Sequence, residues 1–209
     1  MTPEDFKTAG AASPDGYIQV PSAWEGTIGK VQLSDKGAAT YRLKVSLSEA
    51  QKAMGIKTTS IRMSNRIFID GIEVLSSGNP ALSKDAGYVM TNTPYSTAFY
   101  PQNKEVEIIV QVADYDFRKG GIVQSIYLGT QEDIYMLAAH NNFLNVFLVA
   151  CLFITWLYYL FVFIGRRKDL SVLYYSVYAL SFSAFEIMYG EKYLLQMLYS
   201  LSDHYNILL

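Results

Sequence analysis

Cysteine is nearly absent from this chain of 209 residues. The single one, Cys151, has no partner for an intrachain disulfide, so the polar part must rely on a hydrophobic core. The two histidines stand in no recognisable zinc or nucleophile–base pattern. A net charge of −2, with no run dense in Lys and Arg, argues against nucleic-acid binding. We therefore expect no enzyme activity, no metal and no cofactor.

Charged side chains are also missing from two long stretches in the second half of the chain. Residues 141–165 contain no Asp, Glu, Lys or Arg, and residues 171–190 contain only Glu186. About 20 apolar residues in a helix cross the ~30 Å of hydrocarbon in a bilayer. We predict two transmembrane helices over these ranges, joined by a short turn at residues 166–170.

The turn is basic, with Arg166, Arg167 and Lys168 in a row. Short loops rich in Lys and Arg stay on the cytoplasmic side, so the turn is expected inside and residues before 141 outside. This topology gives the chain an extracytoplasmic N-terminal domain. Because animal extracellular domains usually carry disulfides, their absence favours the cytoplasmic (inner) membrane of a bacterium. A carboxylate inside a membrane helix is a functional candidate by default, which applies to Glu186. The alternative is that Glu186 reaches the outer interface or pairs with Lys192.

The sequence is expected to be a fragment that is truncated at both ends. Residues 1–10 (MTPEDFKTAG) lack the apolar core of a signal peptide, although the topology requires export. An upstream signal sequence is therefore expected to have been removed or left out. Residues 191–209 are predicted to be an external segment followed by the start of a truncated third helix.

Residues 13–131 are predicted to form a mainly β domain. Apolar and polar residues alternate at 39–47 and 105–112, as in strands with one buried face. Asp70-Gly71 between two apolar runs indicates a hairpin with a type I′ turn. The fold class we predict is an antiparallel jelly roll or β-sandwich. Further strands are expected at 17–20, 58–63, 98–100 and 122–128, and a helical turn or two at 48–54.

Seven side chains of this domain are candidates for ligand binding. Trp24 can stack on a sugar ring, but a core position is favoured. Arg42 can grip an anionic or hydroxyl-rich ligand, although a solvated strand face is the more ordinary role. Arg62, Arg66 and Asp70 flank the hairpin and can converge on one sheet face, or merely protect an edge strand.

Asp114, Asp116 and Arg118 form the densest charged cluster of the predicted domain. Two carboxylates fall well short of the six to eight oxygens that Ca²⁺ takes. A turn with local ion pairs is the better interpretation. Asp114 and Arg118 remain candidates for contact with a small ligand.

Several segments resemble one known family in the same order along the chain. Pro21 and Trp24, followed by ATYRLKV at 39–45, are similar to its Pro-x-x-Trp and Gly-x-x-Tyr-Arg-Leu patterns. FIDG at 68–71 stands where the family has a Val-Asn-Gly hairpin, and GGIVQSIYLG at 120–129 resembles its closing strand. FIGRRKDLSVLYY at 163–175 resembles its first membrane hairpin.

The family comprises the bacterial seven-transmembrane receptors with diverse intracellular signalling modules. The resemblance spans about residues 17–198 and implies an external, galactose-binding-like jelly-roll sensor that binds a carbohydrate or other small ligand. Asp70 and Asp114 replace residues that are often Asn in the family. Five of the seven helices and the cytoplasmic module are missing.

We hypothesise a receptor fragment whose partners are the ligand, membrane lipid, the remaining helices and an output module. The alternative is a non-sensing assembly or protein–protein interaction module at the cell surface. The chain can also form a homo-oligomer. A third hypothesis, a glycosidase-like enzyme, is disfavoured because the sequence shows no carboxylate pair for a plausible cleft.

Overall fold

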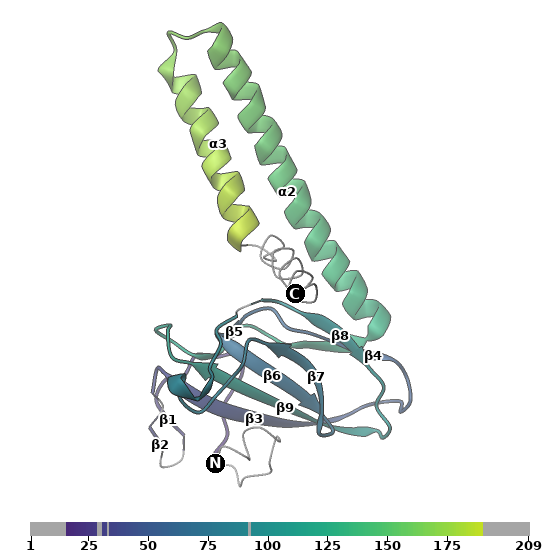
Figure 1. Ribbon diagram of the computed structural model, residues 1–209. Helices are drawn as coiled ribbons and strands as arrows, with labels where there is room; N and C mark the ends of the chain where they lie inside the picture. The colour runs from purple at the N-terminus through teal and green to yellow at the C-terminus, as the bar shows by residue number, and fades with distance from the viewer. Residues whose placement is uncertain (1–15, 29–30, 33, 92, 190–209) are drawn as a thin grey trace, which may run out of the picture. The chain divides into compact units, whose positions relative to one another are not determined.

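The computed structural model describes residues 16–28, 31–32, 34–91 and 93–189 (Figure 1). The chain divides into two compact units, Met1–Tyr135 and Met136–Leu209. The first, here called the β unit, consists of short antiparallel strands, and the second of long helices. The coarse prediction of antiparallel β structure followed by two apolar helices is confirmed. The residues predicted to begin a third helix lie outside the described residues.

The larger sheet has the strand order β3-β9-β6-β7. Its strands are β3 (Gly37–Ser46), β9 (Glu105–Asp114), β6 (Ser64–Ile69) and β7 (Ile72–Ser77). The first two pair along their full lengths, from Gly37 opposite Asp114 to Ser46 opposite Glu105. The alternation in the sequence therefore predicted both long strands correctly.

The smaller sheet has the order β11-β4-β8. Its strands are β11 (Tyr127–Thr130), β4 (Met54–Lys57) and β8 (Ser96–Phe99). Two further ribbons pair β1 (Thr27–Ile28) with β2 (Val31–Gln32), and β10 (Gly121–Ile122) with β5 (Ile61–Arg62). A short 3₁₀ helix, η1, spans Lys84–Ala86.

One hydrophobic core connects the two larger sheets. Ile56 of β4, Phe99 of β8 and Val112 of β9 belong to the same buried cluster. Each fully buried aliphatic side chain of this kind contributes about 1.5–3 kcal/mol relative to exposure. The β unit is thus held by apolar packing between two antiparallel sheets, without a disulfide.

The β6–β7 hairpin turns at Asp70-Gly71, as predicted. Asp70 has φ 48° and Gly71 has φ 80°, the two positive values that a type I′ turn requires. The Asp70 carboxylate accepts a hydrogen bond from the Glu107 backbone N–H at 2.8 Å. The turn is therefore fastened to β9 as well as closing its own hairpin.

Other local predictions were wrong. Residues 17–20 are not a strand, because pairing begins only where the Ser22 and Trp24 N–H groups donate to the Ile122 and Gly120 carbonyls. Residues 48–52 are bends rather than helix, and Met54 already belongs to β4. The closing strand is divided into β10 and β11, which pair with different partners. The alternation at 39–47 predicts Leu43 on the buried face of its strand, but its side chain is 59% exposed, because β3 is an edge strand.

The helical unit contains most of α2 (Gln131–Gly165) and all described residues of α3 (Leu170–Tyr189). Both helices are long and apolar enough to cross a membrane. The first begins at residue 131 rather than 141, so the segment before the predicted span is helical and continuous with it.

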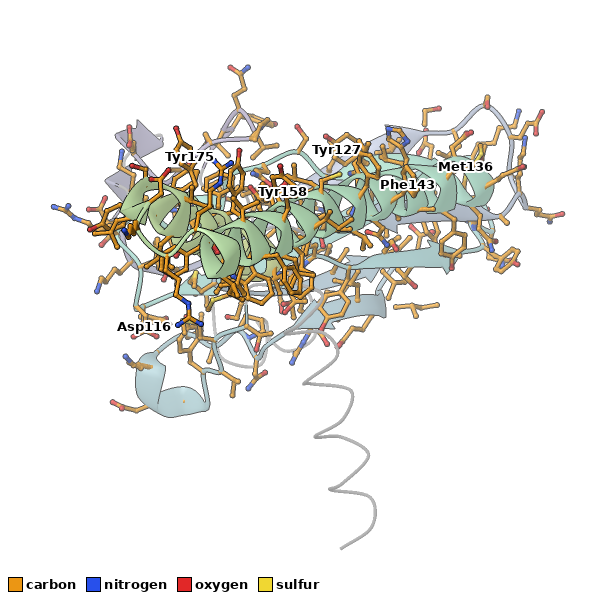
Figure 2. The ribbon with its side chains drawn as sticks, turned by 90° about the horizontal axis from the view of Figure 1, so that it is seen from above. Asp116, Tyr127, Met136, Phe143, Tyr158 and Tyr175 are labelled. Atoms are coloured by element: carbon orange, nitrogen blue, oxygen red, sulfur yellow. The ribbon has the colours of Figure 1, made fainter. Side chains whose placement is uncertain are left out.

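Small side chains let the two helices approach each other. Ser176, Ala179 and Ser183 of α3 are buried. The Ser176 hydroxyl donates to the Trp156 carbonyl at 3.3 Å, and the rings of Tyr159 and Tyr175 stack at 5.7 Å. Many larger side chains, among them Phe143 and Tyr158, project outward and are exposed (Figure 2). Such extensive exposed apolar surface is typical of a lipid-facing or helix-facing surface.

Candidate functional site

The outer face of the four-stranded sheet, opposite the core, collects several predicted site residues. Strand alternation turns Val110 and Val112 of β9 toward the core and Ile109 and Gln111 away from it. Ile109 packs with Phe68 of β6 in a separate small cluster on that side. Cross-strand register then places the following residues on the same face: Arg42, Arg66 and Glu107.

The two arginines of the outer face are held by carboxylates of adjacent strands. Arg42 on β3 pairs with Glu107 on β9, with an Nη2–Oε1 distance of 2.5 Å. Arg66 on β6 lies 3.3 Å from the Glu73 carboxylate and donates to the Asn79 side-chain oxygen at 2.9 Å. The structure thus brings Arg42 and Arg66 onto one face, where each is neutralised by an acidic partner.

Gln111 is the residue of this face that the sequence did not single out. It lies on the central strand β9, opposite Thr40 on one side and Arg66 on the other. Its side chain is fully buried, and neither polar atom of the amide has a hydrogen-bond partner. A buried polar atom left unpaired costs about 1–3 kcal/mol. An isolated Gln in an alternating strand gives no signal of such a position.

Trp24 lies in the core and not on the surface. It is 3% exposed, and its indole N–H donates to the Tyr41 hydroxyl at 2.6 Å. A Cβ on Gly120 would lie 2.5 Å from the ring, so only glycine lets the chain pass there. Burial raises the pKa of Tyr41, although the Trp24 hydrogen bond opposes the shift. The core position favoured from the sequence is therefore confirmed, and stacking of Trp24 on a sugar is wrong because the ring is buried.

Asp114 is likewise enclosed. It is fully buried, and its Oδ1 accepts the backbone N–H groups of Asp116 and Phe117 at 3.1 and 2.9 Å. This arrangement fixes the turn after β9, as expected of an Asp at such a position. The prediction that Asp114 contacts a small ligand is therefore wrong, because its carboxylate is enclosed. Among the described residues, no cluster of three or more His, Cys, Asp or Glu side chains could hold a metal.

The remaining predicted residues do not converge on the outer face. Arg62 on β5 lies over the Phe117 ring, 4.9 Å from its centroid. Arg118 is exposed in the loop after β9. Asp70 marks the end of the face, where it holds the hairpin turn against Glu107. The seven candidates are thus dispersed over core, turns and one sheet face.

The segment after β7 is fastened to the loop after β9. The Tyr115 hydroxyl donates to the Ala81 carbonyl at 3.0 Å, and Lys84 pairs with Asp116. The ring of Tyr88 meets that of Tyr115 edge-on at 5.1 Å. Desolvation by burial raises the pKa of Tyr88 to about 12. The same cause raises the pKa of Tyr115.

The junction between β11 and α2 contains no linker. Thr130 ends β11 and caps the helix, since its hydroxyl accepts the Asp133 N–H at 3.2 Å and donates to the Asp133 carboxylate at 2.6 Å. Glu132 and Asp133 place negative charge at the positive end of the helix dipole. The Gln131 N–H donates to the Ala53 carbonyl at 3.1 Å, which ties the first turn to the start of β4.

Two glycines form a floor for the first turn of α2. Gly55 of β4 and Gly129 of β11 are directly opposite in the register. Ile134 is 4% exposed, and its Cβ would be 2.8 Å from a Cβ on Gly55. The same side chain would be 3.7 Å from a Cβ on Gly129. We call this arrangement the glycine notch, defined by Gly55, Gly129 and Ile134.

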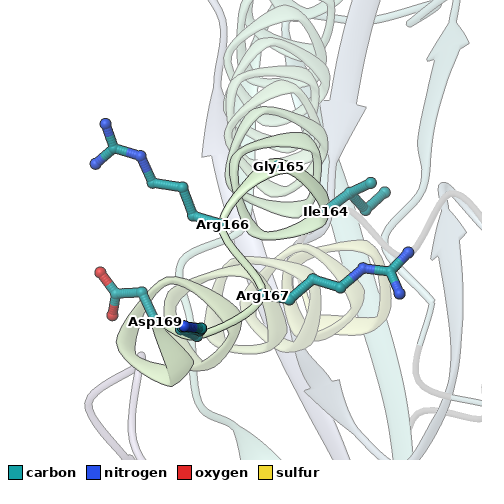
Figure 3. Close-up of a pocket in the computed structure, with 6 residues that line it drawn as sticks. Ile164, Gly165, Arg166, Arg167 and Asp169 are labelled. Carbon is teal, nitrogen blue, oxygen red and sulfur yellow. The ribbon is translucent and has the colours of Figure 1, made fainter.

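Two predicted features belong to the helical unit. Glu186 is half-buried in the last turns of α3; its suggested partner Lys192 lies outside the described residues. Arg166, Arg167 and Lys168 are exposed and line an open hollow at the turn between the helices (Figure 3). The turn is thus a surface rather than an enclosed pocket.

No protein-family model and no curated protein matches the sequence. Similar solved structures include a GH2 β-galacturonidase from Eisenbergiella tayi bound to galacturonate, at 18% identity and a TM-score of 0.39, covering 54% of this chain. Another is a putative β-galactosidase from Bacteroides fragilis, at 13% identity and a TM-score of 0.39, covering 53%. This chain spans only 20% and 18% of those two structures. A likeness at this level carries no inference about the activity of this chain.

Proposed function

We propose that this chain is the sensing part of a bacterial membrane receptor. The β unit is a jelly-roll, galactose-binding-like domain on the outer side of the cytoplasmic membrane, and it binds a carbohydrate or other small ligand. Helices α2 and α3 cross the membrane, and the basic turn at Arg166–Lys168 lies in the cytoplasm. The signal passes to further helices and a cytoplasmic output module beyond this sequence. No catalysis is assigned to the chain.

One observation carries this proposal: α2 is a single helix that begins inside the β unit and ends at the basic turn. Its first turn is fixed by the glycine notch and by the hydrogen bond from Gln131 to Ala53. From Ile134 to Gly165 it contains no Asp, Glu, Lys or Arg. A flexible linker would uncouple an external domain from its membrane helix, and no linker separates β11 from α2.

The outer face of the four-stranded sheet is the surface we assign to the ligand. Arg42 on β3 and Arg66 on β6 offer guanidinium donors on the two strands that flank β9. Hydroxyl-rich and carboxylate-bearing sugars are recognised by groups of this kind. The ligand must bind two states of the receptor with different affinity, since equal affinity shifts no equilibrium.

Cys151 offers a direct test, because it is the only cysteine and lies exposed on α2. The full chain is labelled there with an environment-sensitive fluorophore, reconstituted into vesicles and titrated with neutral and acidic monosaccharides and oligosaccharides. A saturable change in emission with one sugar, lost in Arg66→Gln, is the expected result. Binding that leaves the Cys151 probe unchanged would refute transmission through α2.

Topology is tested separately, by adding protease to spheroplasts that carry the chain. Cleavage of the β unit in intact spheroplasts is expected. Protection until the membrane is broken would place that unit in the cytoplasm and end the receptor proposal.

A second function, assembly through a sheet edge, is favoured by one feature. Strand β3 is ten residues long and lies at the edge of its sheet, with Leu43 exposed. Exposed edge strands pair readily with other strands, although Arg42 and Lys44 oppose this by their charge. Light scattering of the full chain in detergent distinguishes the two, since a ligand-independent dimer disrupted by Leu43→Lys would support assembly.

A further inference from the structure

The turn between α2 and α3 is compact and is held by backbone hydrogen bonds at both of its ends. The Arg166 N–H donates to the Val162 and Phe163 carbonyls at 2.9 and 3.1 Å, which ends α2. The Asp169 N–H then donates to the Arg166 carbonyl at 3.0 Å. The turn therefore holds its side chains on a defined backbone.

Positive charge at this turn exceeds the negative charge of the one neighbouring carboxylate, Asp169. Arg166, Arg167 and Lys168 are exposed, and none forms an ion pair with another residue in the described part of the chain. Asp169 is the one acidic side chain of the turn; its carboxylate accepts the Ser171 N–H at 3.2 Å at the start of α3 and leaves a net positive charge on the turn. The three cations remain available to an anion from outside the chain.

The surroundings of these cations are apolar on one side. An open hollow of about 680 Å³ is lined by Ile164 and Gly165 together with the four residues of the turn. Figure 3 shows the Arg166 and Arg167 side chains leaving the turn on opposite sides. Each flank of the hairpin thus offers one guanidinium next to the apolar end of α2.

We propose that the basic turn binds the phosphate headgroups of anionic phospholipids, one on each flank of the hairpin. This inference rests on the proposed membrane insertion, which places the turn among headgroups and the Ile164 side chain among acyl chains. Guanidinium forks bind phosphate oxygens bidentately. Each cation near an anionic membrane surface raises the binding affinity roughly fivefold, so the two arginines together raise the affinity for an anionic lipid about 25-fold.

Native mass spectrometry of the full chain in detergent tests this, with equimolar phosphatidylglycerol and phosphatidylcholine as probes. We expect preferential retention of phosphatidylglycerol, up to two molecules per chain, and a loss of that preference by about 25-fold in R166Q/R167Q. The matched control K52Q/K104Q removes two exposed lysines of the β unit and should retain the preference. The variant R166K/R167K keeps the charge and should retain most of it.

Three results would overturn the inference. One is equal retention of both lipids by the unmodified chain, and another is an unchanged preference in R166Q/R167Q. The third is displacement of phosphatidylglycerol by inorganic phosphate at equal concentration, which would indicate a site for a free anion. Carbonate extraction of membranes distinguishes a failure of the proposed membrane insertion from a failure of the headgroup site. A chain that carbonate releases refutes the proposed membrane insertion, whereas an embedded chain without lipid preference refutes only the headgroup site.

Discussion

Replacing Gly55 with alanine tests the glycine notch most directly. The new Cβ would lie 2.8 Å from the Ile134 Cβ and 3.0–3.1 Å from both of its γ carbons. Atoms this close to a helix backbone cannot move aside by a rotamer change, so either β4 or the first turn of α2 must shift. Overpacking of this kind costs about 1–3 kcal/mol.

Gly129→Ala is the matched control. Its Cβ would meet the Ile134 side chain at 3.7 Å, an ordinary contact, on the strand directly opposite. Both substitutions lower the entropy of the unfolded chain by the same amount, worth about 0.4–1 kcal/mol of stabilisation. The net expectation is a loss of about 1–2 kcal/mol for Gly55→Ala and no loss for Gly129→Ala.

Tryptophan fluorescence can follow unfolding of the β unit if Trp156 is first replaced by Phe, which leaves Trp24 as the only tryptophan. A loss of this size lowers the Tm by roughly 4–8 °C per kcal/mol in a domain of about 100 residues. Hydrogen exchange adds a local measurement, because the Gln131 amide bonded to Ala53 should exchange faster in Gly55→Ala. Equal behaviour of the two variants would show that Ile134 is not seated on these glycines.

Three further predictions concern the β unit. Gln111→Met removes a buried amide without partners and should raise the free energy of unfolding by about 1 kcal/mol; destabilisation in denaturant would show that the amide is partnered. Asp70→Ala should cost about 1–2 kcal/mol through the Glu107 hydrogen bond and the positive φ, whereas Asp70→Asn should be nearly neutral in the same assay. Burial raises the pKa of Tyr88 to about 12 in the folded protein, against 10.0 in the unfolded chain. Ionisation of this phenol therefore favours the unfolded chain, so the stability present below pH 10 is lost as the pH rises toward 12. Unfolding midpoints of Tyr88→Phe should therefore fall less between pH 10 and 12 than those of the unmodified chain.

Local periodicity allowed a large part of the fold to be predicted from the sequence. The alternation at residues 39–47 and 105–112 reports one buried face per strand, and Asp70-Gly71 reports a turn that only such residues adopt easily. The apolar runs defined both helices for the same reason. In each case the information lies within one continuous stretch of the chain.

Features that depend on distant residues were not predictable. Residues 17–20 look like a strand, yet their sequence does not specify that β10 pairs only with the chain from Ser22 onward. The core position of Trp24 was favoured from the sequence, but its close packing on Gly120, nearly a hundred residues away, was not predictable. The glycine notch needs β4 and β11 side by side, so neither Gly55 nor Gly129 stands out alone.

The position of the glycine notch constrains how a ligand signal would reach the helix. The outer face proposed for the ligand belongs to the four-stranded sheet, whereas Ile134 rests on β4 and β11 of the other sheet. The route between them crosses the core, whose buried cluster includes Val112 of β9 and Ile56 of β4. Close-packed cores transmit small displacements because they have few voids to absorb them. A cavity made by Ile56→Ala should therefore weaken the response of a Cys151 probe while leaving sugar affinity nearly unchanged. Equal losses of both in titrations of the labelled chain would place the signal on another route.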